Sequence, residues 1–303
     1  MADAQIAVIG DALIDELNTQ TGIHEFVGGA ALNVAVGLSV LGVETALVAM
    51  VGDDRDGASI RNFLDEHGVL LVASPSVAGS ARATSDRRAG EPFYAFNAAA
   101  QARTIDFDAG AHTAINAAQN VVISSFPFDD RAQFEALRTT VERPENRLIL
   151  DPNPRSGLLH DAQLFAQNFE VLAASSLLTK VSDEDAELLG YASLHALTDR
   201  LIDLGTAHVL TTAGAAGASI VTREGLRVSV PICDVPGPIV DTMGAGDATL
   251  ATIASQITAH GIPTDREAWA EVLGEAMLVA AATCRTNGAL IQLPDTWDRQ
   301  TAR

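Results

Sequence analysis

The residues best suited to chemistry lie in the segment 241–247, Asp-Thr-Met-Gly-Ala-Gly-Asp, which precedes a run with helical spacing. Gly244 and Gly246 let the backbone approach a ligand closely, and the first N–H groups of a helix have no partner inside that helix. Together with the positive end of the helix dipole, these groups form a site for an anion. Asp247 is then placed to accept the proton of a hydroxyl group that attacks a bound phosphate. A plain glycine turn, with Asp247 complementing the helix dipole, is the alternative.

The charged residues limit the kinds of site that can bind such an anion. Lys180 is the only lysine of the chain and no glycine precedes it, so a P-loop is excluded, and the lysine motifs of protein kinases and β-lactamases do not fit. The 39 acidic and 19 basic residues give a net charge of −20 over 303 residues, which argues against nucleic acids and anionic membrane surfaces as partners. An anion must therefore be held locally, by backbone N–H groups, a metal ion or a few arginines.

Three further polar segments follow or end predicted strands. Segment 151–155, Asp-Pro-Asn-Pro-Arg, must turn because proline disfavours helix at the residue before it; Arg155 then points into a cleft or lies on the surface. Segment 212–217, Thr-Ala-Gly-Ala-Ala-Gly, has glycines that admit a ribose and phosphates at a strand end, although a plain turn also fits. Segment 182–185, Ser-Asp-Glu-Asp, is typical of a helix N-terminus.

The elements that position these segments alternate between short apolar strands and helices, which is typical of a mostly parallel sheet. We expect strands at 6–10, 45–52, 121–124, 148–151 and 207–212, and helices at 29–41, 59–67, 246–260 and 267–285. Two polar segments, 16–27 and 82–103, interrupt this alternation, and aromatic residues at 93, 94 and 96 indicate at least one strand there. We expect these segments to form a small β-excursion that covers a site.

Nothing in the sequence divides the chain or directs it to a membrane. No linker or internal repeat is visible, so we expect a single domain over residues 1–303. No apolar run approaches the roughly 18 residues of a membrane span, and the first residues lack the features of a signal peptide. Cys233 and Cys284 form no C-x-x-C or zinc pattern, which favours buried free thiols over a disulfide. We therefore expect a cytoplasmic protein.

Two stretches of the sequence resemble the signatures of one family. Segment 241–247 is similar to the C-terminal signature of the ribokinase, or phosphofructokinase-B-type, family of sugar kinases. The stretch Gly-Gly-Ala-Ala-Leu-Asn-Val-Ala at 28–35 resembles the family's first signature, and Leu-Gly at 41–42 and Val-Gly-Asp-Asp-x-x-Gly at 51–57 follow it. The signatures occur in the family's order, and the likeness extends over residues 5–290.

This resemblance implies a fold and a set of site residues. The fold is an α/β protein, a three-layer α/β/α sandwich with a mostly parallel central sheet and a small β-sheet lid at approximately residues 16–27 and 82–103. Asp247 is implied to be the catalytic base, with Arg155 pointing into the cleft towards the substrate or the transferred phosphate. The anion hole is implied to consist of Gly244, Ala245 and Gly246. The residues implied to bind the sugar are Asp15, Gly28, Gly29 and Asn33. A solvated loop carboxylate is the alternative for Asp15, and a helix-terminal polar residue is the alternative for Asn33.

The resemblance also implies ATP and Mg²⁺. The residues implied to contact the nucleotide are Lys180, Ser182, Asp185, Thr212, Gly214 and Gly217. Ser182 and Asp185 stand where the family has asparagine and glutamate, and therefore reach less far. Asp241 and Gly288 match positions at which relatives bind a monovalent cation such as K⁺.

The implied function is that of an ATP-dependent kinase that transfers the γ-phosphate to a hydroxymethyl group of a small sugar. Segment 151–155 resembles the D-x-N-x-R element of fructokinases and 2-keto-3-deoxygluconate kinases, so fructose is the first substrate expected, and ribose, 2-keto-3-deoxygluconate and nucleosides are alternatives. The partners are then the sugar and ATP, and relatives imply a homodimer through the lid. The rival functions are a non-catalytic sugar or nucleotide sensor, which needs no base at 247, and a nicotinamide-dependent oxidoreductase.

Overall fold

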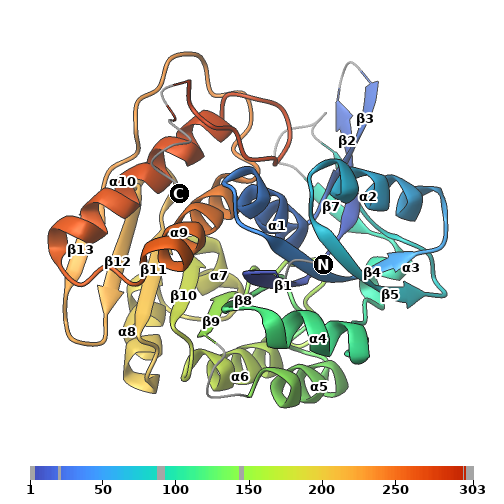
Figure 1. The fold of residues 1–303 in the computed structure, drawn as a ribbon, viewed down its shortest axis with the longest axis horizontal. Helices are drawn as coiled ribbons and strands as arrows, with labels where there is room; N and C mark the ends of the chain where they lie inside the picture. The colour runs from blue at the N-terminus through green and yellow to red at the C-terminus, as the bar shows by residue number, and fades with distance from the viewer. Residues whose placement is uncertain (1–3, 20–21, 87–92, 143–146, 296, 298–303) are drawn as a thin grey trace.

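Two sheets form the framework of the protein (Figure 1). The computed structural model describes residues 4–19, 22–86, 93–142, 147–295 and 297. The larger sheet has nine strands in the order β13-β12-β11-β10-β9-β8-β1-β4-β5. The strands from β11 to β5 in this order are parallel, and β12 and β13 add an antiparallel hairpin at one edge. The strands are β1 (Ile6–Gly10), β4 (Thr45–Gly52), β5 (Leu70–Ser76), β8 (Asn120–Ser124), β9 (Arg147–Asp151), β10 (Leu178–Ser182), β11 (His208–Thr212), β12 (Ala218–Thr222) and β13 (Arg227–Val230).

Helices cover both faces of the larger sheet. Every residue of β1, β4 and β8 is buried, as in parallel sheets that helices cover on two sides. Ile6 and Val8 of β1 pack with α1, α2, α9 and α10, whereas Ala7 and Ile9 pack on the opposite face with α4, α5, α6 and α8. The three-layer α/β/α sandwich predicted from the sequence is therefore confirmed. The helices are α1 (Ala30–Val40), α2 (Arg55–Glu66), α3 (Ala98–Gln101), α4 (Ala109–Ala117), α5 (Arg131–Val141), α6 (Ala162–Ala173), α7 (Asp183–Leu188), α8 (Leu194–Leu204), α9 (Ala245–His260) and α10 (Arg266–Thr283).

The predicted strands and helices are present, and most of their ends agree within two residues. The exception is the helix predicted from residue 59, which begins at Arg55 because the Asp54 carboxylate accepts the Gly57 N–H at 2.8 Å and caps the first turn. Within the described ranges, none of these helices is both long enough and apolar enough to cross a membrane.

The two polar segments that interrupt the alternation form the second sheet, which we call the small sheet. Its order is β3-β2-β6-β7, and β2 pairs antiparallel with β3 but parallel with β6. The predicted segments include residues 20–21 and 87–92, which lie outside the described residues. On one face of the small sheet, Leu13, Ala81 and Ala83 are buried in a cluster that also includes Met50 of β4. The strands are β2 (Leu13–Thr19), β3 (Gly22–Gly28), β6 (Ala81–Asp86) and β7 (Phe93–Phe96).

Arg82 links the small sheet to the body of the protein. Its Nη1 lies 3.1 Å from Glu16 Oε2 on β2, and its Nη2 lies 2.7 Å from Glu25 Oε1 on β3. Its Nε donates to Asp56 on α2, so one guanidinium connects strands of the small sheet with a helix of the larger layer. All four side chains are partly exposed, so each pair alone contributes little, but the arginine separates three carboxylates from one another.

We expect Arg82→Met to lower the free energy of unfolding by about 1–2 kcal/mol, because three mutually repelling carboxylates lose their common partner. Urea unfolding measures this loss, which should shrink at high salt because screening weakens the repulsion. The matched control is Arg138→Met on α5, where the pairs with Glu135 and Glu142 are exposed and predict little change in the free energy of unfolding. Equal losses in the two variants would contradict a linking role for Arg82.

Candidate active site

The carboxyl ends of the central strands bring the predicted site residues to one edge of the larger sheet. Gly10, Ser124 and Asp151 are register partners at the ends of β1, β8 and β9. Ser182 and Thr212 are partners at the ends of β10 and β11. Ligands of open α/β sheets bind at this edge, because the loops and helix N-termini that follow the strands converge there.

The N-terminus of α9 presents an anion site at this edge. Gly244 precedes the helix with φ 79°, a left-handed conformation, and a Cβ at this position would lie 2.0 Å from Ala289 O. Glycine is therefore required there by packing as well as by conformation. No side chain caps the first turn of α9 among the described residues. The Ala245 N–H donates to Thr242 O at a long 3.3 Å, so the N–H groups of Gly246 and Asp247 are the principal donors left for an anion.

Asp247 is held in the first turn of α9 by Asn33 of α1. The Asn33 Nδ2 donates to Asp247 Oδ2 at 2.9 Å, while the buried Asn33 Oδ1 has no hydrogen-bond partner among the described residues. Burial and the nearby Asp151 raise the pKa of Asp247 to about 6, against the opposing effects of Lys180, Asn33 and Arg155. The carboxylate is therefore ionised at neutral pH but more basic than an exposed aspartate, which suits a general base.

Lys180 is a buried cation directly behind the anion site. Its Nζ donates to both carboxylate oxygens of Asp151 at 3.1 Å, and the Asp151 side chain is fully buried. A Cβ on Gly246 would lie 3.2 Å from this Nζ. Burial disfavours the charge of Lys180, but Asp151, Asp185 and Asp247 outweigh that effect and raise its pKa. The lysine therefore stays protonated and supplies positive charge beside the helix N-terminus.

Ser182 and Asp185 bind each other as a capping box at the start of α7. The Ser182 N–H donates to Asp185 Oδ2 at 2.7 Å, and the Asp185 N–H donates to Ser182 Oγ at 3.3 Å. Burial raises the pKa of Asp185 to about 6, although Lys180 opposes the shift. The helix N-terminus predicted from residues 182–185 is thus present, and both side chains already serve it.

Arg155 lies in the turn that follows β9. Its Nη1 is 3.6 Å from Glu184 Oε2, and its side chain is 42% exposed. Burial disfavours its charge, but the surrounding carboxylates of Glu184, Asp247, Asp185 and Asp11 raise its pKa. The structure therefore brings Arg155 within electrostatic reach of Asp247 from a segment about 90 residues away in the chain.

The predicted sugar-binding residues lie where the small sheet joins the larger one. A Cβ on Gly28 of β3 would come 2.3 Å from Asp15 Oδ2 on β2, so glycine lets the carboxylate lie against the backbone. Gly29 has φ 109° and leaves no room for a Cβ beside Asp11 O. Asn33 lies one turn further, on α1. Asp15 and Gly28 therefore belong to the small sheet, whereas β11 belongs to the larger sheet.

The predicted nucleotide segment lies after β11. Thr212 ends that strand, and residues 214–216 form a 3₁₀ turn. Gly214 has φ 49° and open space around its missing Cβ. Gly217 has φ 89°, and a Cβ there would lie 2.2 Å from Val230 O of β13, so this glycine is explained by packing of the hairpin. The segment therefore leaves room for a ligand at Gly214 but not at Gly217.

The predicted cation positions flank the start of α9. Asp241 is buried and its Oδ1 accepts the Met243 N–H at 3.1 Å. Gly288 has φ 86°, and Phe26 of the small sheet lies 3.5 Å from where its Cβ would be. Within the described part of the chain, no group of three or more histidine, cysteine, aspartate or glutamate side chains could hold a metal ion.

The two cysteines are free, as predicted, but the prediction that they are buried was wrong. Cys233 and Cys284 are each half-buried. Cys233 belongs to residues 231–240, a stretch without helix or strand whose residues are mostly exposed. Partial burial still raises the pKa of both thiols, and in Cys284 Asp241 adds to that effect against Arg285.

Sequence reasoning missed two charged residues of this edge, Asp11 and Arg103. Asp11 Oδ1 accepts the Ala31 N–H at the start of α1 at 2.9 Å. Arg103 follows α3 and is one of the groups that act on Asp11 electrostatically. The position of Asp11 directly after a buried strand was a usable signal, whereas nothing local marks Arg103 as buried.

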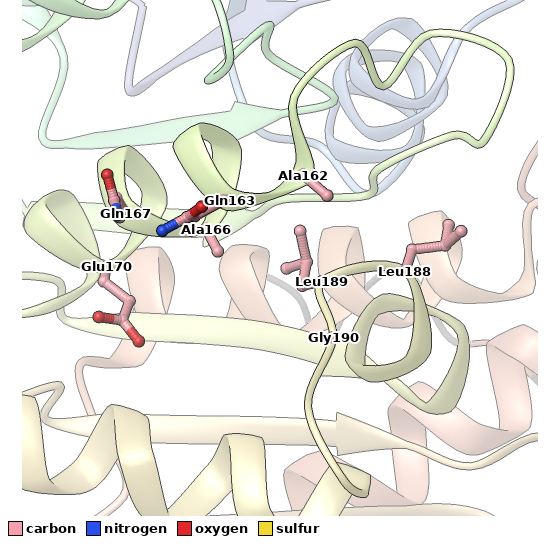
Figure 2. A pocket seen from close by; sticks show the side chains of 8 residues that line it. All are labelled: Ala162, Gln163, Ala166, Gln167, Glu170, Leu188, Leu189 and Gly190. Carbon is pink, nitrogen blue, oxygen red and sulfur yellow. The ribbon is translucent and has the colours of Figure 1, made fainter.

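A separate depression lies away from all of these residues (Figure 2). It has a volume of about 370 Å³ and lies between α6 and the end of α7. None of the predicted site residues lines it, so it is not the candidate active site. Its lining residues are Ala162, Gln163, Ala166, Gln167, Glu170, Leu188, Leu189 and Gly190.

Comparisons with solved structures agree with the fold described above. An aminoimidazole riboside kinase from Salmonella enterica, complexed with aminoimidazole riboside and an ATP analogue, matches with a TM-score of 0.77 and 24% identity over 94% of this chain and 95% of that chain. A fructokinase with bound ATP from Xylella fastidiosa matches with a TM-score of 0.79 and 22% identity over 94% of each chain.

Comparisons with curated sequences identify the family. A fructokinase of Rhizobium leguminosarum bv. trifolii is 31% identical over 278 residues, 86% of this chain and 82% of that protein. A fructokinase of Klebsiella pneumoniae is 28% identical over 98% of this chain and 99% of that protein. The model of the pfkB family carbohydrate kinases matches residues 2–296. The chain belongs to the pfkB family of carbohydrate kinases, and it is an ATP-dependent sugar kinase.

Proposed function

We propose that Asp247 is the general base with which this kinase transfers the γ-phosphate of ATP to a hydroxymethyl group of a small sugar. The observation that carries the proposal is the placement of this carboxylate. It lies in the first turn of α9, beside the unpaired N–H groups of an anion site, and its pKa is raised to about 6. A non-catalytic sensor would have no use for a base at this position, and the family assignment argues against a nicotinamide-dependent oxidoreductase.

The transfer follows from this placement. Asp247 Oδ2 accepts a hydrogen bond from Asn33 Nδ2, which leaves Oδ1 to take the proton of the sugar hydroxyl. The hydroxyl oxygen forms a bond to the γ-phosphorus as the bond from that phosphorus to the bridging oxygen breaks, and ADP leaves. The turn of Gly244, Ala245 and Gly246 forms the proposed anion hole, in which the free N–H groups of Gly246 and Asp247 stabilise the negative charge on the transferred phosphate. Lys180 and Arg155 add positive charge from two sides.

Mg²⁺ fits this site as an ion carried by the nucleotide. Mg²⁺ usually binds through one or two carboxylates, several waters and the substrate phosphates. Asp151 and Asp185 are buried carboxylates at this edge of the sheet. Asp151 accepts a hydrogen bond from Lys180 Nζ, and Asp185 accepts one from the Ser182 N–H. Mg²⁺ bound to the phosphates would offset their charge, which a protein of net charge −20 cannot do as a whole.

The sugar side of the proposal uses the residues around the small sheet. Asp15 is proposed to accept hydrogen bonds from sugar hydroxyls, and Gly28 and Gly29 let the sugar approach the backbone. The buried Asn33 Oδ1, which lacks a partner among the described residues, supports a contact of Asn33 with a sugar hydroxyl. Fructose is the first neutral sugar to test, because of the D-x-N-x-R element and the relatives named fructokinase.

The nucleotide is proposed to lie over the ends of β10 and β11. Lys180 lies on β10, Thr212 ends β11, Gly214 follows with open space around its missing Cβ, and Gly217 shapes the turn before β12. Ser182 and Asp185 keep the α7 terminus in place and are proposed to meet the nucleotide through water, because their side chains already bind each other.

Three further proposals concern the surroundings of the site. Asp241 and the turn at Gly288 would hold a monovalent cation such as K⁺, which is supported by the buried carboxylate beside the first turn of α9. A homodimer through the small sheet is supported by the edge strand β3, on which Ile23 is exposed. The need for ATP supports a cytoplasmic location.

Asp247→Asn tests the general base. We expect kcat to fall by about two to four orders of magnitude, because the amide cannot accept the proton, while the affinities for sugar and ATP change little.

The folded state raises the pKa of Asp247 above its ordinary value, so the ionised carboxylate lowers stability above about pH 6 and not below the ordinary pKa. The variant should therefore melt at the same or a higher temperature at neutral pH. Asp265 caps α10, and the control variant Asp265→Asn should keep the wild-type activity. An Asp247→Asn variant within about threefold of the wild-type rate would overturn the assignment.

The pH dependence of kcat/KM tests the same residue by a second route. Asp247 must be ionised to accept a proton, so kcat/KM should rise about tenfold per pH unit up to about pH 6 and then level off. Asn33→Ala removes a hydrogen bond that lowers this pKa, so the break should move to higher pH. Initial rates over the acid-to-neutral range measure both profiles, and a break that moves to lower pH would contradict the proposed contact.

Gly246→Val tests the anion site. The added methyl groups would press on Lys180, because a Cβ at this position lies only 3.2 Å from its Nζ, and would disturb the helix N-terminus that is proposed to bind the phosphate. We expect kcat to fall by about two orders of magnitude, the usual loss when an oxyanion contact is removed. The control Gly274→Ala lies on α10, where a Cβ meets nothing within 4 Å, and should leave turnover unchanged. A folded Gly246→Val variant with normal turnover would show that no phosphate binds at this turn.

A further inference from the structure

One asparagine joins the two points at which the chain enters and leaves the β6–β7 part of the small sheet. Ser80 precedes β6, and Asn97 follows β7 and caps α3. The Asn97 Nδ2 donates to Ser80 O at 2.9 Å. Its Oδ1 accepts the Arg82 N–H at 3.0 Å and the Ala100 N–H at 2.9 Å. The side chain thus connects the start of β6 with the end of β7 and with the helix that follows.

Ser80 fastens this junction to the larger sheet. Its Oγ accepts the N–H of Gly52, the last residue of β4, at 3.1 Å and donates to Asp54 Oδ1 at 2.7 Å. The Ser80 N–H donates to Asp54 Oδ2, also at 2.7 Å. Asp54 is exposed, but Ser80 is buried, and a Cβ on Gly52 would lie 2.5 Å from Ser80 N. The start of β6 therefore lies directly against the end of β4 and the N-terminus of α2.

The pairing of β6 with β2 carries this position on to Asp15. The two strands are parallel, with Ala81 beside Leu13 and Ala83 beside Asp15. Ala81 and Ala83 are buried in the same small cluster as Met50 of β4. A displacement of β6 along β4 would therefore move β2 and change the place of Asp15 relative to the larger sheet. The cluster has few large apolar side chains, so the polar contacts at the start of β6 matter for this position.

We propose that Asn97 is a positioning residue for sugar binding, because it fixes β6 and thereby the strand that carries Asp15. The proposal rests on the role proposed above for Asp15. The partners of the Asn97 side chain are the backbone groups of Ser80, Arg82 and Ala100, so Asn97 acts through the small sheet and not by touching the sugar. An amide suits this place because it donates to the carbonyl and accepts from the two N–H groups at once.

Asn97→Asp tests the proposal, because it keeps the shape and the acceptor but turns an oxygen towards Ser80 O. With fructose first in a panel of neutral sugars, we expect the KM for the sugar to rise by about 3- to 10-fold, the effect of losing one hydrogen bond. The KM for ATP should stay within about twofold, because the nucleotide is proposed to lie over β10 and β11. Ser80→Ala, which removes only the Oγ contacts, should shift the KM for the sugar in the same direction and provides the test if Asn97→Asp does not fold.

The matched control is Asn168→Asp on α6. Asn168 is half-buried like Asn97, and its Nδ2 donates to Phe128 O at 2.7 Å, far from the small sheet in the order of elements. The control should change neither KM. An unchanged KM for the sugar in both Asn97→Asp and Ser80→Ala, or an equal rise in the KM for ATP, would overturn the proposal.

Hydrogen exchange of the backbone amides separates this proposal from the function on which it rests. In Asn97→Asp, the amides of β2 and β6 should exchange faster than in the wild type, while those of β1 and β8 keep their rates. If no sugar is phosphorylated, or if Asp15→Ala leaves the KM for the sugar unchanged, the role proposed for Asp15 fails. Exchange then decides the question for Asn97 alone: a change confined to β2 and β6 supports its positioning of the small sheet, and unchanged or uniformly faster exchange refutes it.

Discussion

Three aspartates meet at one edge of a strongly acidic protein, and a single buried lysine makes their proximity tolerable. Asp151 is fully buried against Lys180, and Asp185 and Asp247 act on the same cation. Burial raises the pKa of Asp185 and of Asp247 to about 6, and the positive charge of Lys180 keeps both values from rising further. The compact ammonium also fits behind Gly246, where the broader fork of an arginine would compete with the helix N-terminus for space. The ionisation of Asp247, and so the chemistry proposed for it, depends on this contact.

The packing of α9 fixes the direction in which its N-terminus points. This helix is buried on nearly all sides between α1, α10 and the sheet, so it cannot tilt without disturbing the core. Gly244 allows the chain to pass against Ala289, and α1 brings Asn33 to Asp247 from the adjacent position. A rigid helix with a free N-terminus is a better anion site than a loop, because its donors are aligned before the ligand arrives.

The small sheet shows how a polar, weakly periodic segment becomes ordered. Its strands bury one face on a few alanines and leucines, and Arg82 joins its other side to α2. Phe26 touches the turn at Gly288, which itself touches the start of α9. The sheet that carries Asp15 is therefore linked to the start of α9 through the turn at Gly288, although few apolar residues hold it.

The sequence by itself determined the layers of the fold and the glycine turn before α9. Buried strands such as β1 and the glycine turn before α9 are local patterns, and local patterns can be read without knowing what lies opposite them. The family resemblance also implies that Asp15 and Asn33 bind the sugar, which stays a prediction. The sequence could not indicate which side chains already have partners.

Only the tertiary structure decided those partners. Asn33 and Asp247 are 214 residues apart, and no local pattern links them. Lys180 binds Asp151 because β9 and β10 are neighbours in the sheet, and Ser182 and Asp185 bind each other instead of reaching outward. Arg103 ends a predicted polar segment, and the packing of β1, β6 and β8 around it leaves its Nε buried without an acceptor among the described residues. The cost of a buried charge depends on every group around it, and the folded chain alone brings those groups together.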